Sequence, residues 1–186
     1  EQSNCYLVED RAYESLSFKP MSNEVKVDSH IIVGTFSKGF SMTGYRVGYL
    51  ISLDKRLITE MENYIYNSVQ CLPTCIQEGT CEALKRESEI REKVQQIYHG
   101  RLITAEQILK ATRIEYMQPQ SYPFIYINTG DQDCEVITEK LLERGIAVAP
   151  STAFSRRNDF IRVSLMADEK NISTAMNIII EILRKE

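Results

Sequence analysis

Lys38 is the residue whose type and setting most clearly suggest chemistry. It lies in a stretch of apolar residues and glycines, residues 37–49, eight positions before Arg46. A β-branched run precedes the stretch at 30–33 and an apolar run follows at 47–51, so we expect Lys38 on a loop between two buried strands. Burial lowers the pKa of a lysine, and a neutral amine can form a Schiff base with a carbonyl group. A buried lysine paired with a carboxylate is the structural alternative.

The residue order of this stretch is Ser-Lys-Gly-Phe-Ser-Met-Thr-Gly-Tyr-Arg-Val-Gly-Tyr. It closely resembles the lysine motif of class I/II aminotransferases, fold-type-I enzymes that use pyridoxal 5'-phosphate (PLP). The resemblance implies that Lys38 carries the cofactor as a Schiff base and moves the proton during catalysis, and that Arg46 binds the cofactor phosphate. Thr35 matches a position whose hydroxyl commonly binds this phosphate. Ser37 either adds a second hydroxyl or caps its own backbone.

A second match lies at the end of the apolar run 5–8, where Asp10 and Tyr13 are three positions apart. The resemblance implies that Asp10 is a buried carboxylate that keeps the pyridine nitrogen of the cofactor protonated, and that Tyr13 hydrogen-bonds its phenolic oxygen. Asp-x-x-Tyr by itself is more often a cap between a strand and a helix. It indicates a site here because Lys38 follows at the expected distance.

A third match is the alternating segment 159–167, which contains one arginine, Arg162. The resemblance implies that its planar guanidinium binds the α-carboxylate of the substrate. An arginine on the solvated face of a strand is the alternative. The upstream segment 145–155 resembles the strand and loop that precede this arginine in the family, although Ser151 and Ser155 stand where the family usually has glycine.

The remaining pattern predicts an α/β fold in two parts. Apolar spacing predicts strands near residues 5–10, 30–33, 47–51, 124–128, 146–149 and 160–164, and helices over 54–67, 75–85, 88–111, 133–144 and 169–185. The resemblance implies that residues 1–112 are the C-terminal portion of the PLP-binding large domain, with a mostly parallel sheet and the interdomain helix. Residues 113–186 would then form the small α+β C-terminal domain.

Several family features have no counterpart in the sequence: a glycine-rich phosphate loop, an aromatic residue that stacks on the pyridine, and an Asn-Pro-rich segment. We therefore expect the chain to be the C-terminal half of an aminotransferase. By itself it should bind PLP weakly and transaminate little. A sheet without its first strands has an exposed edge, so we expect the protein to associate, as a homodimer in the complete enzyme.

Composition restricts the possible partners and locations. The chain has 186 residues, 43% of them hydrophobic, and a net charge of -4, which argues against general nucleic-acid binding. No apolar run approaches the length of a membrane span, and the opening residues do not resemble a signal peptide. The five cysteines form no Cys-x-x-Cys pair and the two histidines are distant from them, so we expect reduced thiols, a cytoplasmic protein and no metal site.

The function expected from these motifs is transfer of an amino group between an amino acid and a 2-oxo acid. The sequence of the lysine motif is most similar to that of microbial aspartate or broad-specificity aminotransferases. It does not identify the amino acid that serves as substrate. Two alternatives stay open. A PLP-dependent lyase or decarboxylase of the same fold shares the Lys38 motif, and the isolated chain could be a folded but non-catalytic module.

Overall fold

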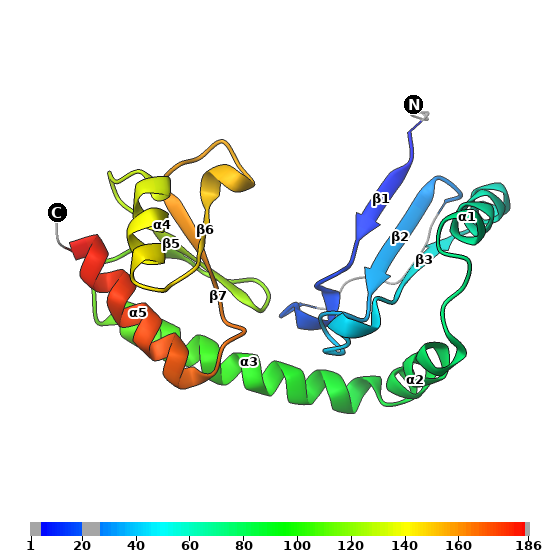
Figure 1. Ribbon diagram of the computed structural model, residues 1–186, viewed down its shortest axis with the longest axis horizontal. Coiled ribbons are helices and arrows are strands. Elements are labelled where there is room, and N and C mark those ends of the chain that lie inside the picture. Colours follow the sequence, from blue (N-terminus) through cyan, green and yellow to red (C-terminus); the bar gives the residue numbers. More distant parts are fainter. Residues whose placement is uncertain (1–4, 20–26, 185–186) are drawn as a thin grey trace. The chain divides into compact units, whose positions relative to one another are not determined.

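The computed structural model of the protein describes residues 5–19 and 27–184 (Figure 1). Two compact units, Glu1–Val94 and Gln95–Glu186, divide within the long helix α3, Glu87–Lys110. The domain boundary expected near Thr112 lies two residues beyond this helix and remains a prediction. Residues 1–4, which belong to the predicted first domain, are outside the described residues.

The first unit contains a three-stranded sheet in the order β1-β2-β3, made of Leu7–Asp10, His30–Thr35 and Gly48–Ser52. β1 and β2 are parallel, whereas β2 and β3 are antiparallel. The expected mostly parallel sheet is therefore found for the first pair only. Because β1 and β2 run in the same direction, their carboxyl ends meet at one edge of the sheet.

Burial differs between these strands. The first three residues of β2 are buried, whereas most residues of β1 and β3 are exposed. The prediction that Lys38 lies between two buried strands is therefore wrong for β3, where Tyr49 and Ile51 are exposed. Residues of β3 are exposed because the helix α1, Lys55–Ser68, packs against only part of this strand.

The helix α1 of the first unit begins at a short polar side chain that caps it. The carboxylate of Asp54 accepts hydrogen bonds from two backbone N–H groups of α1, so the residue expected to begin the helix is its cap. α2 spans Thr74–Lys85. Its Ile76 and Ala83 pack against a small apolar cluster in the Lys38 loop, formed by Phe36, Phe40, Met42 and Val47. The predicted bounds of α1, α2 and α3 are correct to within one residue.

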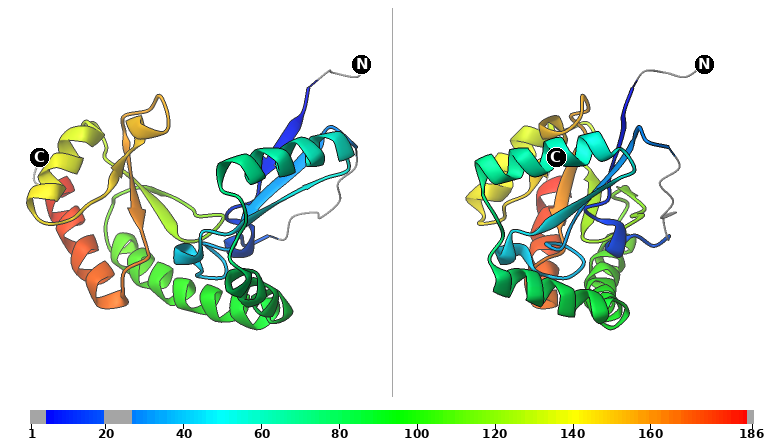
Figure 2. Two further views of the ribbon diagram at one scale, coloured as in Figure 1. Left: turned by 45° about the vertical axis from the view of Figure 1, so that its right-hand side comes forward. Right: turned by 90° about the vertical axis from the view of Figure 1, so that its right-hand side faces the viewer.

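The second unit contains a four-stranded antiparallel sheet covered by helices on one face (Figures 1 and 2). Its strand order is β4-β5-β7-β6, and its covering helices are α4, Cys134–Glu143, and α5, Glu169–Arg184. The strands are Tyr116–Met117 (β4), Phe124–Asn128 (β5), Ala149–Pro150 (β6) and Phe160–Ser164 (β7). The buried residues Ile125, Ile127, Ile161 and Val163 form one face of this sheet.

The strand predicted over 146–149 is much shorter in the structure. Gly145 ends α4 with a left-handed backbone, φ 77°. The N–H of Ile146 reaches the carbonyl of Leu141, and that of Gly145 reaches Leu142, which is a Schellman motif. This cap keeps the first predicted strand residues out of the sheet, so β6 begins only at Ala149.

Apolar residues at helical spacing predict one buried stripe on each of two helices: Ile172, Met176, Ile179 and Leu183 on α5, and Ile90, Val94, Ile97, Ala105 and Leu109 on α3. On α5, Ile172, Met176 and Ile179 are buried as predicted. On α3, Val94 is buried but Ile97 is 53% exposed, so the prediction is wrong for Ile97. No helix within residues 5–19 and 27–184 combines the length and the hydropathy needed to cross a membrane.

Candidate functional site

Asp10 and Thr35 lie at the same edge of the first sheet. Asp10 ends β1 and Thr35 ends β2, and the parallel register places Asp10 beside Val33. Side chains alternate along a strand, so Val33 and Thr35 share a face, and Asp10 belongs to the same face. The carboxyl ends of parallel strands are the usual place for ligands in open α/β sheets.

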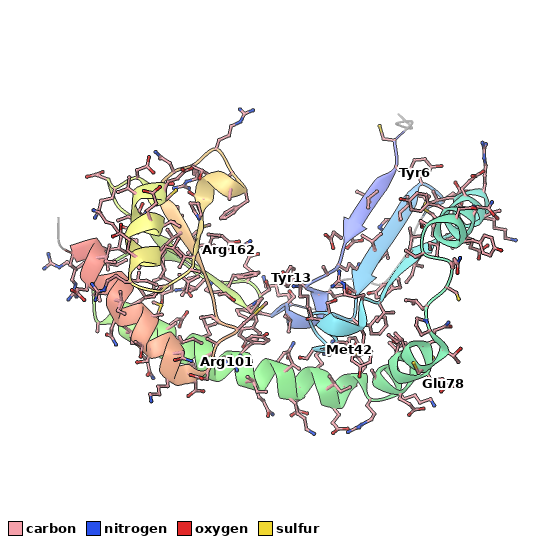
Figure 3. The ribbon with its side chains drawn as sticks, viewed as in Figure 1. Tyr6, Tyr13, Met42, Glu78, Arg101 and Arg162 are labelled. Atoms are coloured by element: carbon pink, nitrogen blue, oxygen red, sulfur yellow. The ribbon has the colours of Figure 1, made fainter. Side chains whose placement is uncertain are left out.

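Lys38 occupies the turn that follows β2, as predicted. Its side chain is half-buried, and its Nζ atom lies 5.5 Å from the centre of the Tyr13 ring. Tyr13 is the residue before the 3-10 helix η1, Glu14–Leu16, and Figure 3 shows it next to the Lys38 loop. The structure thus brings the predicted lysine and tyrosine together. In the part of the chain that the structure describes, no carboxylate forms an ion pair with Lys38, which disfavours the structural alternative.

Gly39 allows this approach. A Cβ atom placed at Gly39 would overlap with Cβ of Ser15, a residue of η1. The missing side chain therefore lets the turn that carries Lys38 lie directly against the helix that follows Tyr13. The apolar cluster of Phe36 and its neighbours holds the other side of the same loop.

We expect Gly39→Ala to destabilise the chain by about 1–3 kcal/mol, because the added methyl group overpacks this contact. The free energy of unfolding in urea measures the effect. Gly79→Ala is a matched control, since Gly79 lies inside α2 with open space around it. Alanine favours a helix, so this control should stabilise the chain by about 0.5–1 kcal/mol. Equal effects of both variants would contradict the close approach at Gly39.

The three residues expected to bind phosphate are joined by hydrogen bonds. The hydroxyl of Thr35 lies 3.0 Å from that of Ser37 and accepts from the Ser37 backbone N–H at 3.1 Å. Thr43 donates its hydroxyl hydrogen to the Ser37 carbonyl, and Arg46 donates to the Thr43 carbonyl. The Thr35 hydroxyl thus caps the turn, and the Ser37 hydroxyl accepts a hydrogen bond from the Thr35 hydroxyl. Two hydroxyls and a guanidinium in one connected group can bind an anion.

The side chain of Asp10 is exposed, contrary to the expected buried carboxylate. Asp10 ends β1, an edge strand whose other side has no partner strand within the described residues. Its Oδ1 accepts a hydrogen bond from the backbone N–H of Ala12 at 2.9 Å. The residue therefore makes the local turn of the capping alternative, and its second carboxylate oxygen has no hydrogen bond from the described residues.

Sequence reasoning missed an ionic cluster behind this edge. The buried guanidinium of Arg11 contacts Glu9 at 3.0 Å and Glu14 at 3.5 Å, and His30 Nε2 lies 2.9 Å from Glu9. Glu9 and Arg11 alternate with Asp10 along the chain, so the cluster lies on the opposite face. It links β1, β2 and η1, the elements that carry Asp10 and Tyr13. Four charged residues within residues 9–14 were the available signal.

We expect Glu9→Gln to remove a pH-dependent part of the stability. The hydrogen bond from Arg11, with help from His30, holds the pKa of Glu9 below its ordinary value of 4.5. A lowered pKa in the folded state means that this contribution is present above pH 4.5 and is lost as the pH falls through the lowered pKa.

The measurement is unfolding in urea at a series of pH values, which should show the largest difference between wild type and Glu9→Gln at neutral pH. The exposed Glu78 on α2 offers the control Glu78→Gln for the general effect of one charge. A difference for Glu9→Gln that stays constant from neutral pH to pH 3 would contradict the role of Arg11.

Arg162 lies in the second unit, on the face of the sheet opposite the buried Ile161 and Val163. Its Cζ atom lies over two aromatic rings, 4.5 Å from the centre of Phe124 and 5.2 Å from that of Phe154. The arginine is half-buried on this face, so both its expected role in substrate binding and the alternative of an arginine on the solvated face of a strand stay predictions. Figure 3 shows the position of Arg162 on the sheet. The sequence did not indicate the two aromatic contacts.

The serines at the expected glycine positions fit the structure. Ser151 is 2% exposed, and its hydroxyl donates to the carbonyl of Arg157 at 2.8 Å. The backbone N–H of Ser155 donates to the carbonyl of Ser151 at 2.8 Å. Neither serine has a positive φ, so no glycine is required there. The loop between β6 and β7 is therefore held by the hydroxyl of Ser151.

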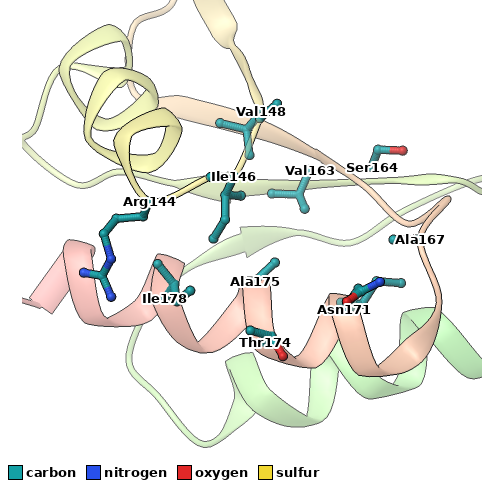
Figure 4. Close-up of a pocket in the computed structure, with 13 residues that line it drawn as sticks. Arg144, Ile146, Val148, Val163, Ser164, Ala167, Asn171, Thr174, Ala175 and Ile178 are labelled. Carbon is teal, nitrogen blue, oxygen red and sulfur yellow. The ribbon is translucent and has the colours of Figure 1, made fainter.

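A pocket of about 360 Å³ lies in the second unit between α5, the segment 145–148 and β7 (Figure 4). Its lining is mainly apolar and includes Val163, whose side chain belongs to the face that the helices cover. Arg162 points from the opposite face. The pocket is therefore separate from the arginine that sequence analysis selected.

Comparison with known proteins agrees with the predicted family. Residues 1–179 match the family described as aminotransferase class I and II. The chain is 31% identical to an aspartate aminotransferase of Thermococcus kodakarensis over 89% of its length, and 28% identical to an aspartate/prephenate aminotransferase of Thermus thermophilus over 92%. A double mutant of the Thermus thermophilus aspartate aminotransferase superposes on 95% of the chain with a TM-score of 0.86 and 28% identity.

The chain spans about half the length of these relatives: 44% and 46% of the two sequences and 48% of the solved structure. Its α/β fold therefore corresponds to about half of an aspartate aminotransferase chain. The match to the family covers nearly the whole chain, from residue 1 to 179 of 186. The protein belongs to the class I and II aminotransferase family.

Proposed function

We propose that this chain is the C-terminal half of a PLP-dependent aminotransferase, which transfers an amino group between an amino acid and a 2-oxo acid. The observation that carries the proposal is the placement of Lys38 over Tyr13, next to the strand end that bears Asp10. Family membership supports the reaction class. The activity itself belongs to the longer protein, because the relatives are about twice as long as the matched region.

The side chains of the first unit match the groups of PLP. Lys38 offers an amine for the aldehyde, and Tyr13 a phenol for the ring oxygen. Asp10 offers a carboxylate with an uncommitted oxygen for the pyridine nitrogen. The connected group of Thr35, Ser37 and Arg46 offers donors for the phosphate. When bound, PLP supplies an electron sink that stabilises negative charge at the substrate Cα.

The chain's own residues would then have three tasks. Lys38 Nζ would take the proton from the substrate Cα and donate it to the cofactor carbon that receives the amino group, a transfer that requires a neutral amine. Tyr13 keeps one side of this amine against an aromatic ring, which limits its positions. Arg162 binds the α-carboxylate with paired N–H donors, so that the Cα hydrogen has a defined direction.

The names of the two relatives described above support substrates that carry an α-carboxylate, and those names do not agree on one substrate. One relative is called an aspartate aminotransferase and another an aspartate/prephenate aminotransferase. We propose amino acids and 2-oxo acids as the substrate class and leave the side chain open. The exposed Leu7 and Val8 on the edge strand β1 support association with further protein, which we propose includes a homodimer.

The proposal is tested by incubating the complete protein with PLP, single amino acids and 2-oxoglutarate, and measuring glutamate and the new 2-oxo acid. Equal amounts of both products are expected. Release of carbon dioxide or ammonia without glutamate would indicate a decarboxylase or lyase and would refute aminotransfer. The 186-residue chain, assayed alongside, should show little product.

A further inference from the structure

Arg162 is a cation whose N–H donors are not used within its own unit. No hydrogen bond or ion pair of its guanidinium is formed with the described residues 95–184. Arg157 differs, because it donates two hydrogen bonds to the carboxylate of Asp159, from Nε at 2.8 Å and from Nη2 at 2.5 Å. Five N–H donors without a protein acceptor are ready to bind an anion.

Two aromatic rings take the place of a counter-ion for Arg162. Phe124 comes from β5, the strand on one side of β7, and Phe154 from the loop that follows β6, the strand on its other side. A ring face attracts a cation through its negative quadrupole and excludes water from that side. Ring carbons do not accept strong hydrogen bonds, so the N–H groups stay available to a ligand.

The position of Phe154 is fixed by its surroundings. Its ring meets that of Tyr126 at 5.8 Å with an interplanar angle of 76°, an edge-to-face contact. Its backbone N–H donates to the carbonyl of Ser151, the buried serine that anchors the loop. Tyr126 in turn lies directly across from Arg162 in the sheet register. Phe154 therefore contacts both Tyr126 and Arg162, which are register partners on adjacent strands.

We propose that Phe154 and Phe124 are positioning residues that hold Arg162 for a planar carboxylate. This inference rests on the proposed function, in which Arg162 binds the substrate α-carboxylate. The clamp keeps the guanidinium partly dry and limited to few rotamers before the ligand arrives. Less side-chain freedom is then lost on binding, and the charge-assisted hydrogen bonds form in a less polar environment.

The test measures carboxylate binding without requiring turnover. Acetate is titrated into the full 186-residue chain while the Nε–H signal of Arg162 is followed by NMR. The wild-type signal should shift and saturate. In Phe154→Leu the dissociation constant for acetate should rise by about threefold to thirtyfold, the range of a desolvated cation–π contact. Phe154→Tyr, which keeps the ring, should restore the wild-type value.

Phe160→Leu is the matched control. Phe160 is on the same strand and its ring lies 4.6 Å from the Cζ atom of Arg157, but that arginine already has a carboxylate partner. This variant should change the dissociation constant for acetate by less than about twofold, because the lost cation–π contact belongs to Arg157. An unchanged dissociation constant in Phe154→Leu, an equal rise in both variants, or a wild-type Arg162 signal that does not respond to acetate would overturn the clamp.

Turnover in the complete protein separates this inference from the proposed function. If the protein transaminates, Phe154→Leu should raise KM for amino acids with little change in kcat, and should leave unchanged its activity toward the corresponding amines that lack a carboxylate. If the protein does not transaminate but acetate binding depends on Phe154, the clamp stands and the proposed function falls. A loss in kcat alone, with acetate binding intact, would instead contradict the clamp.

Discussion

Replacing Lys38 with alanine in the complete protein should lower the rate of transamination by about 10²–10⁴-fold, the usual contribution of a positioned proton-transferring group. Alanine removes both the amine that would carry the cofactor and the base at the substrate Cα. The folded structure should persist, because the half-buried Lys38 side chain has no ion pair with the described residues. Initial rates with a fixed amino acid and 2-oxoglutarate, compared with the wild type, measure the effect.

Lys85→Ala is the control for this prediction. Lys85 ends α2, is exposed, and among the described residues pairs only with the exposed Glu82 at 2.6 Å. Its loss should leave the rate within about twofold of wild type, because exposed ion pairs contribute little. A Lys38→Ala protein that transaminates at the wild-type rate would rule out the proposed role of Lys38.

Asp10→Asn should lower the rate of transamination by about tenfold to thousandfold while PLP stays bound. An opposite charge near a titrating group shifts its pKa by about one to three units, and each unit corresponds to about tenfold in the rate that depends on it. Asparagine keeps the shape and the hydrogen bond to Ala12 but loses the charge. The measurement pairs steady-state rates with the PLP content after dialysis.

Asp131→Asn, in an exposed loop of the second unit, controls for the loss of one negative charge. It should leave both the rate and the PLP content unchanged. If Asp10→Asn keeps the wild-type rate, or if it loses PLP and activity together, Asp10 does not act by holding a proton on the cofactor.

Local sequence signals predicted the elements that carry the candidate site. Alternating and β-branched residues indicated β2 and β7, and capping residues such as Asp54 and Asp133 lie within one residue of the predicted helix starts. The turn with Lys38 followed from the glycines and the flanking strands. These features depend on neighbours in sequence, so a single chain is enough to predict them.

Features that depend on distant residues could not be predicted in the same way. The short β6 results from the cap at Gly145, which competes with strand pairing over 146–148. The exposure of Asp10 follows from its place on an edge strand. The rings against Arg162 come from positions 38 residues before it and 8 residues before it, on separate elements. Only the folded sheet brings them together.

Lys38 is proposed to carry PLP, and reductive labelling tests this role directly. The complete protein is saturated with PLP, reduced with borohydride so that the bound cofactor becomes a stable pyridoxyl group, digested, and mapped by mass spectrometry. We predict one pyridoxyl group per chain on the peptide that contains Lys38, and none in a Lys38→Ala protein treated in the same way. A stoichiometric label on any other lysine, with Lys38 unmodified, would contradict the account.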